Sequence, residues 1–147
     1  MIMKKSLGFT LIEVLLSVAL IALLAGIGVP IYQSFQNRNS LDVAAVVLVN
    51  SLYRAEVLAR GVDGDSTWGV YVAASNITIF KGASYAARDT TFDEFFDTTN
   101  GITVTGTQEY IFSKFTGYPV ATGSTILTST NNETRTIAIN AKGTISY

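Results

Sequence analysis

Apolar and polar positions alternate in three different ways along the 147 residues of the chain. Residues 9–31 are almost entirely apolar, with one carboxylate at Glu13. After a polar stretch, apolar residues return at the i, i+3, i+4, i+7 spacing of one helix face, at Leu41, Ala44, Ala45, Leu48, Leu52, Ala55 and Leu58 or Ala59. Both patterns predict helix, and Arg60 followed by Gly61 is typical of a helix end.

From Gly61 onward the helical spacing gives way to short alternating runs rich in Val, Ile, Thr, Tyr and Phe. Such runs between turn residues predict antiparallel strands. We expect Ile137 and Ile139 to share a buried face with Ile126 and Ile145. The predicted fold class is α+β, a long N-terminal helix packed on an antiparallel sheet. The predicted strands are 67–73, 76–81, 101–106, 109–115, 124–130, 133–140 and 143–147.

These patterns divide the chain into a basic leader, a helix in two halves and a globular domain. The boundaries are 1–8, 9–31, 32–60 and 61–147. The apolar half of the helix is long enough to span a membrane and too long for the apolar part of a secretory signal. Because two lysines precede it, the positive-inside bias would keep the leader in the cytoplasm and send the globular domain outward.

Glu13 lies where the chain is expected to meet lipid. A carboxylate at the bilayer centre costs about 2.5–3.5 kcal/mol on the insertion scale and less near the interface. One interpretation is a residue tolerated near the membrane edge. The other is a residue whose charge has a function.

The stretch KKSLGFTLIEVLLSVALIALL, residues 4–24, resembles the N-terminus of type IV prepilins and type II secretion pseudopilins. The matching features are a basic leader ending at Gly8, the aromatic Phe9, and an apolar helix that opens with Thr10 and reaches Glu13. The resemblance implies that a prepilin peptidase cuts between Gly8 and Phe9 on the cytoplasmic side and that the new Phe9 amine is N-methylated. If subunits stack with a small stagger, Glu13 would meet the Phe9 amine of a neighbour, and assembly would relieve an unpaired charge.

Pro30 follows Gly26 and Gly28 and removes one helical hydrogen bond. Gly and Pro are common in membrane helices in any case. The pilin resemblance implies a different role, a weak point where the helix bends or unwinds as subunits pack.

The later predicted strands indicate a narrower group within the pilin and pseudopilin superfamily. Their order, together with Arg135 and the Gly143 turn in TRTIAINAKGTISY, looks like the GspH/FimT group of minor pilins and pseudopilins. The pattern differs from that of typical major pseudopilins of secretion systems, whose C-terminal loop carries a calcium site. The alternative that the chain is a major subunit of the same superfamily stays open.

The composition mainly excludes certain kinds of chemistry. The chain has no Cys and no His, so it lacks disulfides, thiolate metal ligands and the usual near-neutral general base. The net charge of −1 does not favour bulk nucleic-acid binding. We expect neither an enzyme nor a cofactor.

Two local clusters leave ligand binding open. Residues 88–97 gather acidic side chains that could hold calcium, although the EF-hand spacing is missing and such segments are usually solvated. Lys114, Arg135 and Lys142 could form a weak DNA-binding patch, against eight acids between Asp63 and Glu133.

The favoured function is a structural, minor subunit of a type IV pilus-like or type II secretion pseudopilus filament. The alternatives are a major pilin, or an adhesive or DNA-uptake tip pilin that binds DNA weakly through its C-terminal hairpin. The resemblance implies a prepilin peptidase, other pilin or pseudopilin subunits, an inner-membrane assembly platform and membrane lipid as partners. The expected location is a single pass through the inner membrane, with the globular domain outside the cytoplasm, and then the assembled filament.

Overall fold

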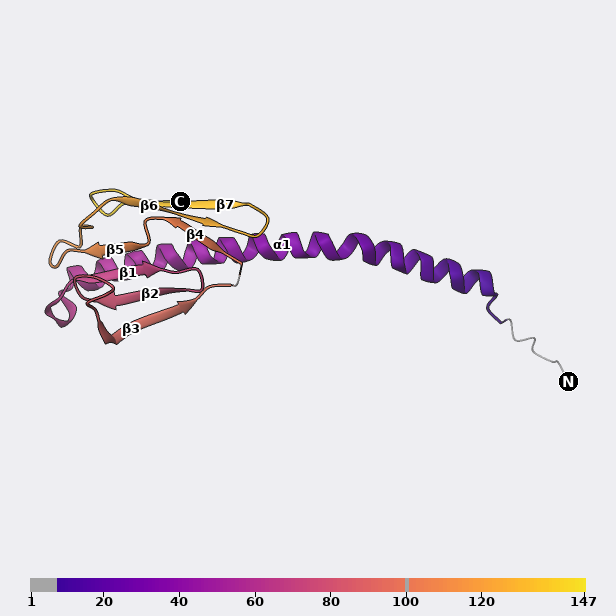
Figure 1. Ribbon diagram of the computed structural model, residues 1–147, viewed down its shortest axis with the longest axis horizontal. Coiled ribbons are helices and arrows are strands. Elements are labelled where there is room, and N and C mark those ends of the chain that lie inside the picture. The colour runs from indigo at the N-terminus through magenta and orange to yellow at the C-terminus, as the bar shows by residue number, and fades with distance from the viewer. Residues whose placement is uncertain (1–7, 100) are drawn as a thin grey trace. The chain divides into compact units, whose positions relative to one another are not determined.

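The computed structural model describes residues 8–99 and 101–147, apart from the side chains of residues 28–30. The chain divides into two compact units, Met1–Gln36 and Asn37–Tyr147. One helix, α1 (Leu11–Arg60), contributes residues to both units (Figure 1). Each unit is described by itself.

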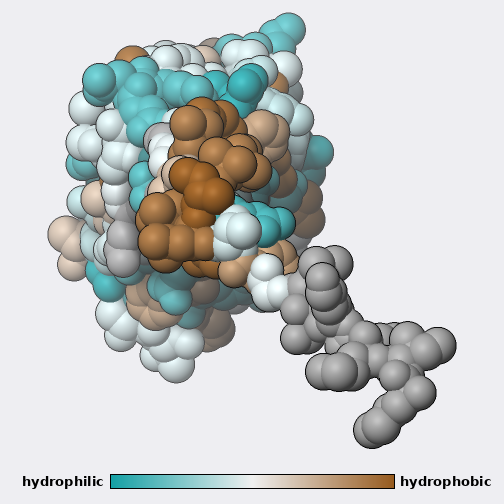
Figure 2. Space-filling view, turned by 90° about the vertical axis from the view of Figure 1, so that its right-hand side faces the viewer, coloured by the Kyte–Doolittle hydropathy of each residue, from teal (hydrophilic) through white to brown (hydrophobic). Residues whose placement is uncertain are grey.

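In the first unit, α1 is apolar on all sides. An 18-residue window of the helix has a mean hydropathy of 2.6, and none of it is buried. Figure 2, in which hydrophobic residues are brown, shows such side chains gathered in one patch. The helical backbone continues through Pro30, whose side chain lies outside the described residues, as do leader residues 1–7. By length and composition, this helix can cross a membrane.

The second unit contains two four-stranded antiparallel sheets. The first sheet has the order β3-β2-β1-β5, and the second has the order β4-β6-β7-β8. A short 3-10 turn, η1 (Asp63–Asp65), links α1 to the first strand. The strands are β1 (Trp68–Val72), β2 (Asn76–Lys81), β3 (Asp89–Asp97), β4 (Thr103–Gly106), β5 (Glu109–Phe112), β6 (Gly123–Thr128), β7 (Thr134–Ile139) and β8 (Ile145–Ser146).

One hydrophobic core joins α1 to both sheets of the second unit. The apolar stripe predicted from the sequence is buried, with Leu41, Leu48 and Leu52 fully enclosed. Strand residues such as Val70 of β1 and Ile137 of β7 meet it from the two sheets. The α+β class predicted from the sequence is therefore confirmed, with two sheets in place of the single sheet that was expected.

A polar network links the two sheets inside this core. The Thr125 hydroxyl on β6 donates to the Thr107 carbonyl at 2.5 Å. Since that bond uses its only proton, the buried Tyr110 hydroxyl on β5 donates to Thr125 Oγ1, at 2.7 Å. Burial raises the pKa of Tyr110 above its ordinary value. Buried polar groups with such partners are compatible with a stable core.

Two details of the strand prediction are wrong. The predicted strands leave out the segment Asp89–Asp97, which forms β3, an edge strand where exposed charges are tolerated. Ile126 was placed on the buried face, yet its neighbour Thr125 is the residue that faces Ile137 across the ladder. The hydrogen bonds of Thr125 allow a polar residue to be buried there, and Ile126 points to the other face.

The helix ends at Arg60, as predicted. The Gly61 amide still donates to the Val57 carbonyl at 2.8 Å. The left-handed residue that follows is Val62, with φ 57°, rather than Gly61. A β-branched residue rarely adopts this conformation, so the loop after the helix is strained.

Candidate functional site

The Gly8–Phe9 peptide lies outside the helix and is open to solvent. Residues 8–10 are non-helical. The Phe9 side chain is 84% exposed. A Cβ added at Gly8 would meet no atom within 4 Å. The bond expected to be cut is therefore not obstructed by any described part of the chain.

Thr10 and Glu13 form a reciprocal pair of hydrogen bonds at the start of α1. The Glu13 amide donates to Thr10 Oγ1 at 3.3 Å, and the Thr10 amide donates to Glu13 Oε2 at 3.4 Å. This arrangement is a capping box, which satisfies two backbone donors that the first helical turn leaves open. It explains why the helix begins at Leu11 rather than at Phe9.

Thr10 was missed as a functional candidate. The signal was present in the sequence, because Ser or Thr followed three residues later by Glu before an apolar run is a capping-box pattern. The interpretation of Glu13 was confined to its charge, whereas the structure also gives the carboxylate a local hydrogen-bonding role.

The capping box leaves the Glu13 carboxylate able to bind more. A carboxylate offers about four acceptor positions, and the Thr10 amide occupies one oxygen. Within residues 8–99 and 101–147, no basic side chain forms an ion pair with Glu13. The group can therefore accept from a further donor without losing its contact with Thr10.

Residues 3–29 match the family described as the prokaryotic N-terminal methylation motif. The chain carries a prepilin-type N-terminus. This match supports the type IV pilin and pseudopilin class, whose members are structural rather than catalytic. A prepilin-type N-terminus implies processing by a peptidase and assembly with other pilin subunits, and the apolar helix behind it fits a single-pass inner-membrane pilin. No solved structure matches the chain.

The three basic candidates of the globular unit lie in different environments. Arg135, at the start of β7, binds Asp42 of α1 through Nε at 2.8 Å and Nη2 at 2.7 Å. Lys114 pairs with Asp65, and its hydrogen bond and charge hold the pKa of that carboxyl below its ordinary value. Lys142 is exposed in the turn between β7 and β8.

These three residues do not bring their charges together in one patch. Arg135 lies near the start of β7 and Lys142 follows its end, and the strand from Arg135 to Ile139, at about 3.3 Å per residue, already spans roughly 13 Å. Two of the three cations already have carboxylate partners. Among the described residues, no carboxylate lies within ion-pair distance of Lys142.

The acidic segment is arranged as a strand with paired side chains. Asp93 binds Arg88 at 2.8 Å, and Glu94 binds Arg54 at 2.7 Å. Hydrogen bonds from Thr91 hold the pKa of Asp89 below its ordinary value. In the part of the chain that the structure describes, no three acidic side chains come together as metal ligands would.

Proposed function

We propose that the protein is a minor, structural subunit of a type IV pilus-like or type II secretion pseudopilus filament. The observation that carries the proposal is the prepilin-type N-terminus, in which Glu13 opens a helix whose apolar side chains in residues 11–27 are exposed. An exposed apolar surface of this extent marks a site that contacts a membrane or another protein. Lipid would cover it in the lone subunit, and neighbouring helices would cover it in a filament.

Processing would turn the start of the helix into a charged site. A cut between Gly8 and Phe9 creates an amine one residue before the capping Thr10, and methylation keeps its positive charge. A cation is unfavourable at a helix N-terminus, because the helix dipole is positive there. Glu13 is the acidic residue in the first turn and offsets part of that cost.

Assembly would complete the site. One oxygen of Glu13 keeps the Thr10 amide, and the carboxylate accepts in addition from the Phe9 amine of a neighbouring subunit. In a dry filament core this pair removes two uncompensated charges, each of which is costly when buried alone. Pro30 provides a point where the helix can adjust as subunits pack.

The remaining parts of the chain take the roles that their composition supports. Residues 1–8 are a leader, 9–31 serve as membrane and filament-core helix, 32–60 as the amphipathic half, and 61–147 as the globular domain outside the cytoplasm. The resemblance to the GspH/FimT group supports a minor subunit. A scarce protein in sheared surface fractions fits this assignment, whereas a dominant one indicates the major pilin.

Intact-mass measurement of the chain co-produced with a prepilin peptidase tests the proposal. The expected product begins at Phe9 and carries one added methyl group. Gly8→Ala should be cut better than Gly8→Leu, because the peptidase must enclose the bond. A mature chain beginning beyond Gly26 would show an ordinary signal peptide and overturn the proposal.

A further inference from the structure

The side of α1 that faces away from the core of the globular unit carries a row of exposed side chains. The row, here called the outer stripe, consists of Val43, Val46, Asn50, Tyr53 and Val57. Its four apolar members are between 46% and 65% exposed. Asn50 follows the enclosed Leu48 by two residues, which places it about 160° around a helix of 3.6 residues per turn. Polar residues normally occupy this side of a surface helix, so the outer stripe marks a contact site.

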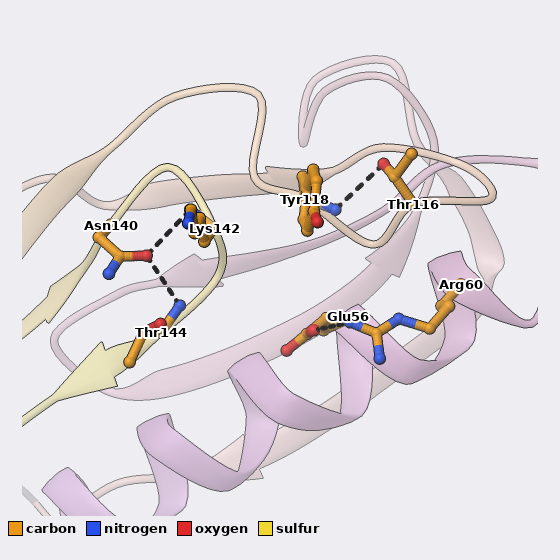
Figure 3. Close-up of polar contacts among 7 residues, drawn as sticks. All are labelled: Glu56, Arg60, Thr116, Tyr118, Asn140, Lys142 and Thr144. Carbon is orange, nitrogen blue, oxygen red and sulfur yellow. Dashed lines mark hydrogen bonds and ion pairs between the residues drawn. The ribbon is translucent and has the colours of Figure 1, made fainter.

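On both sides of the outer stripe, the chain makes contacts with itself. On one side, Arg54 binds Glu94 of β3 at 2.7 Å. An apolar pocket of about 250 Å³ adjoins this pair, and its lining residues are Val47, Asn50, Ser51, Arg54 and Phe96. On the other side, Glu56 binds Arg60 at 2.5 Å, and the turn that carries Lys142 packs against them (Figure 3). The charges beside the stripe thus have partners within the chain, whereas the stripe itself stays exposed.

The outer stripe has the spacing of a coiled-coil seam. Its members follow one another at intervals of three, four, three and four residues, and this alternation keeps a row of side chains facing a partner helix. Val43, Asn50 and Val57 occupy the a positions of the heptad, and Val46 and Tyr53 occupy the d positions. Valine at a positions favours two helices over larger bundles. The spacing therefore indicates that one further helix covers the stripe.

Asn50 indicates which helix this is. An apolar side chain packed on Asn50 would leave the donor and the acceptor of its amide without partners, which is costly in a buried seam. In a parallel pair that lies in register, each a residue faces the same residue of the other helix. A second copy of the chain therefore brings an amide to the same level, and each Asn50 can donate to the carbonyl oxygen of the other.

The membrane anchor supplies the orientation of such a pair. The apolar half of α1 can cross a membrane, and copies inserted in the same way leave the membrane in the same direction, so their chains run parallel. The stripe is about 21 Å long and one helix wide, roughly 200 Å² per copy, below the 800 Å² or so of a typical stable complex. Confinement of both anchors to one membrane raises the effective concentration and favours a contact of this size.

We infer that two copies pair in the membrane through their outer stripes, as a parallel dimer in which Asn50 faces Asn50. The contact is isologous, so it closes at two copies. The inference goes beyond the proposed function, because it concerns free subunits in the membrane rather than a filament. Since the charges beside the stripe already have partners, the seam itself selects the second copy.

Cysteine cross-linking of the full chain in membranes, produced without assembly machinery, tests the pairing. The natural chain has no Cys, so an introduced thiol is the only one. The variant Val46→Cys should give a disulfide-linked dimer after mild oxidation, because d residues of a parallel pair face each other. The control Thr116→Cys, at an exposed position between β5 and β6, should stay monomeric. A Val46→Cys chain that reaches the membrane in normal amount but stays monomeric would overturn the inference.

Charge exchange at position 50 tests the register. In the Val46→Cys chain, Asn50→Asp or Asn50→Lys alone should lower the dimer fraction more than about tenfold, because two like charges would meet in the seam. Two differently tagged chains, one with each change, should cross-link to each other when they are produced together. A folding defect in one chain would not be repaired by the other. Failure of this rescue would overturn the facing of Asn50 with Asn50.

Aromatic variants separate the outer stripe from other exposed apolar residues. In the Val46→Cys chain, Tyr53→Ala should lower the dimer fraction more than about fivefold, and Tyr53→Phe should retain it. Phe115→Ala is the matched control and should change nothing, because Phe115, which is 68% exposed and has φ 70°, lies outside the stripe. Equal losses in Tyr53→Ala and Phe115→Ala would contradict a contact through the stripe.

Cross-links from Val46→Cys to a different membrane protein would show another helix on the stripe and would overturn the inference. The measurement needs no filament, so its result is independent of the proposed function. A chain that is processed and enters filaments, yet gives no dimer in this assay, would remove the pairing and leave the proposed function intact.

Discussion

The two units of the chain place the same residue type in opposite surroundings along one helix. Leu15 and Leu16 in the first unit are 58% and 71% exposed, whereas Leu48 and Leu52 in the second are fully buried. Helix propensity is the same for all four, so the difference lies in what packs on the helix. In the second unit, the two sheets of the same chain pack on the helix and bury its apolar side chains. The first unit needs a cover from outside the chain, which is lipid or another subunit.

The two units also differ in whether their carboxylates have partners within the chain. In the second unit, Asp42, Glu56 and Asp93 each bind an arginine of the same unit. In the first unit, the described contacts of the Glu13 carboxylate are confined to the Thr10 amide. The globular unit therefore pairs several of its acids with its own basic side chains, whereas no described basic side chain pairs with Glu13. This contrast underlies the assembly role proposed for Glu13.

A matched pair of leucine truncations gives the largest expected difference between the units. Leu48→Ala removes a fully enclosed side chain and should lower the free energy of unfolding of the globular unit by about 2–5 kcal/mol. Leu16→Ala should leave that free energy unchanged. Denaturant titration in detergent, followed by Trp68 fluorescence, measures both. Equal effects of the two variants would contradict the division of the chain.

Removal of the first unit should be tolerated. A fragment that begins at Asn37 keeps the whole hydrophobic core, whose residues start at Leu41. It should be soluble and show mixed helix and strand content by circular dichroism. Precipitation or a mainly helical spectrum would mean that the globular unit depends on the apolar helix.

Tyr110→Phe tests the polar link between the sheets and should destabilise the unit by about 0.5–1.5 kcal/mol, the usual net value of a hydrogen bond. Burial raises the pKa of Tyr110 in the folded state, so the folded state retains the proton that the unfolded chain releases. The free energy of unfolding should therefore be constant below about pH 10 and fall as the pH rises above it. In the Phe variant this alkaline fall should shrink. An unchanged profile would show that another group causes it.

The most local effect is expected from the cap of the helix. Thr10→Val removes the acceptor for the Glu13 amide, and loss of a cap costs about 0.5–2 kcal/mol. Hydrogen exchange at the amides of the first turn should then accelerate about 2- to 30-fold, and Thr10→Ser should keep the natural rate. Equal rates in all three chains would mean that the capping box does not form.

The sequence was sufficient for features that depend on local periodicity. The stripe from Leu41 to Ala59 was predicted because every member packs on one core, and the helix end at Arg60 followed from its neighbours. Ile126 was misplaced because polarity alone does not show that Thr125 has buried partners. Strand β3 was missed because its acids obscured the β-forming Thr and Phe residues of an edge strand.

The candidate sites were predictable to different degrees. Glu13 was identified from its unusual place in an apolar run, and Thr10 could have been found from its spacing to Glu13. The pocket between α1 and β3 could not be predicted, because its lining residues, 47–54 and 96, meet only after the chain folds. The exposure of Phe115 likewise depends on a strained loop conformation, which no local sequence pattern predicts.

Filament incorporation of Glu13 variants tests the central claim most directly. Glu13→Gln can keep the capping box, since Gln also serves at that position, but it loses the charge; Glu13→Leu loses both. If the charge serves assembly, both variants should still be cut and fractionate with the inner membrane. An unpaired buried amine costs about 3–5 kcal/mol.

The measurement is recovery of tagged variants in sheared filaments, with the membrane fraction as control. The account predicts that both Gln and Leu variants fall more than about a hundredfold in filaments, that Asp rescues only in part because its side chain is shorter, and that Thr10→Val still assembles. Normal incorporation of the Gln variant would show that the carboxylate acts through the helix cap alone and would contradict the account.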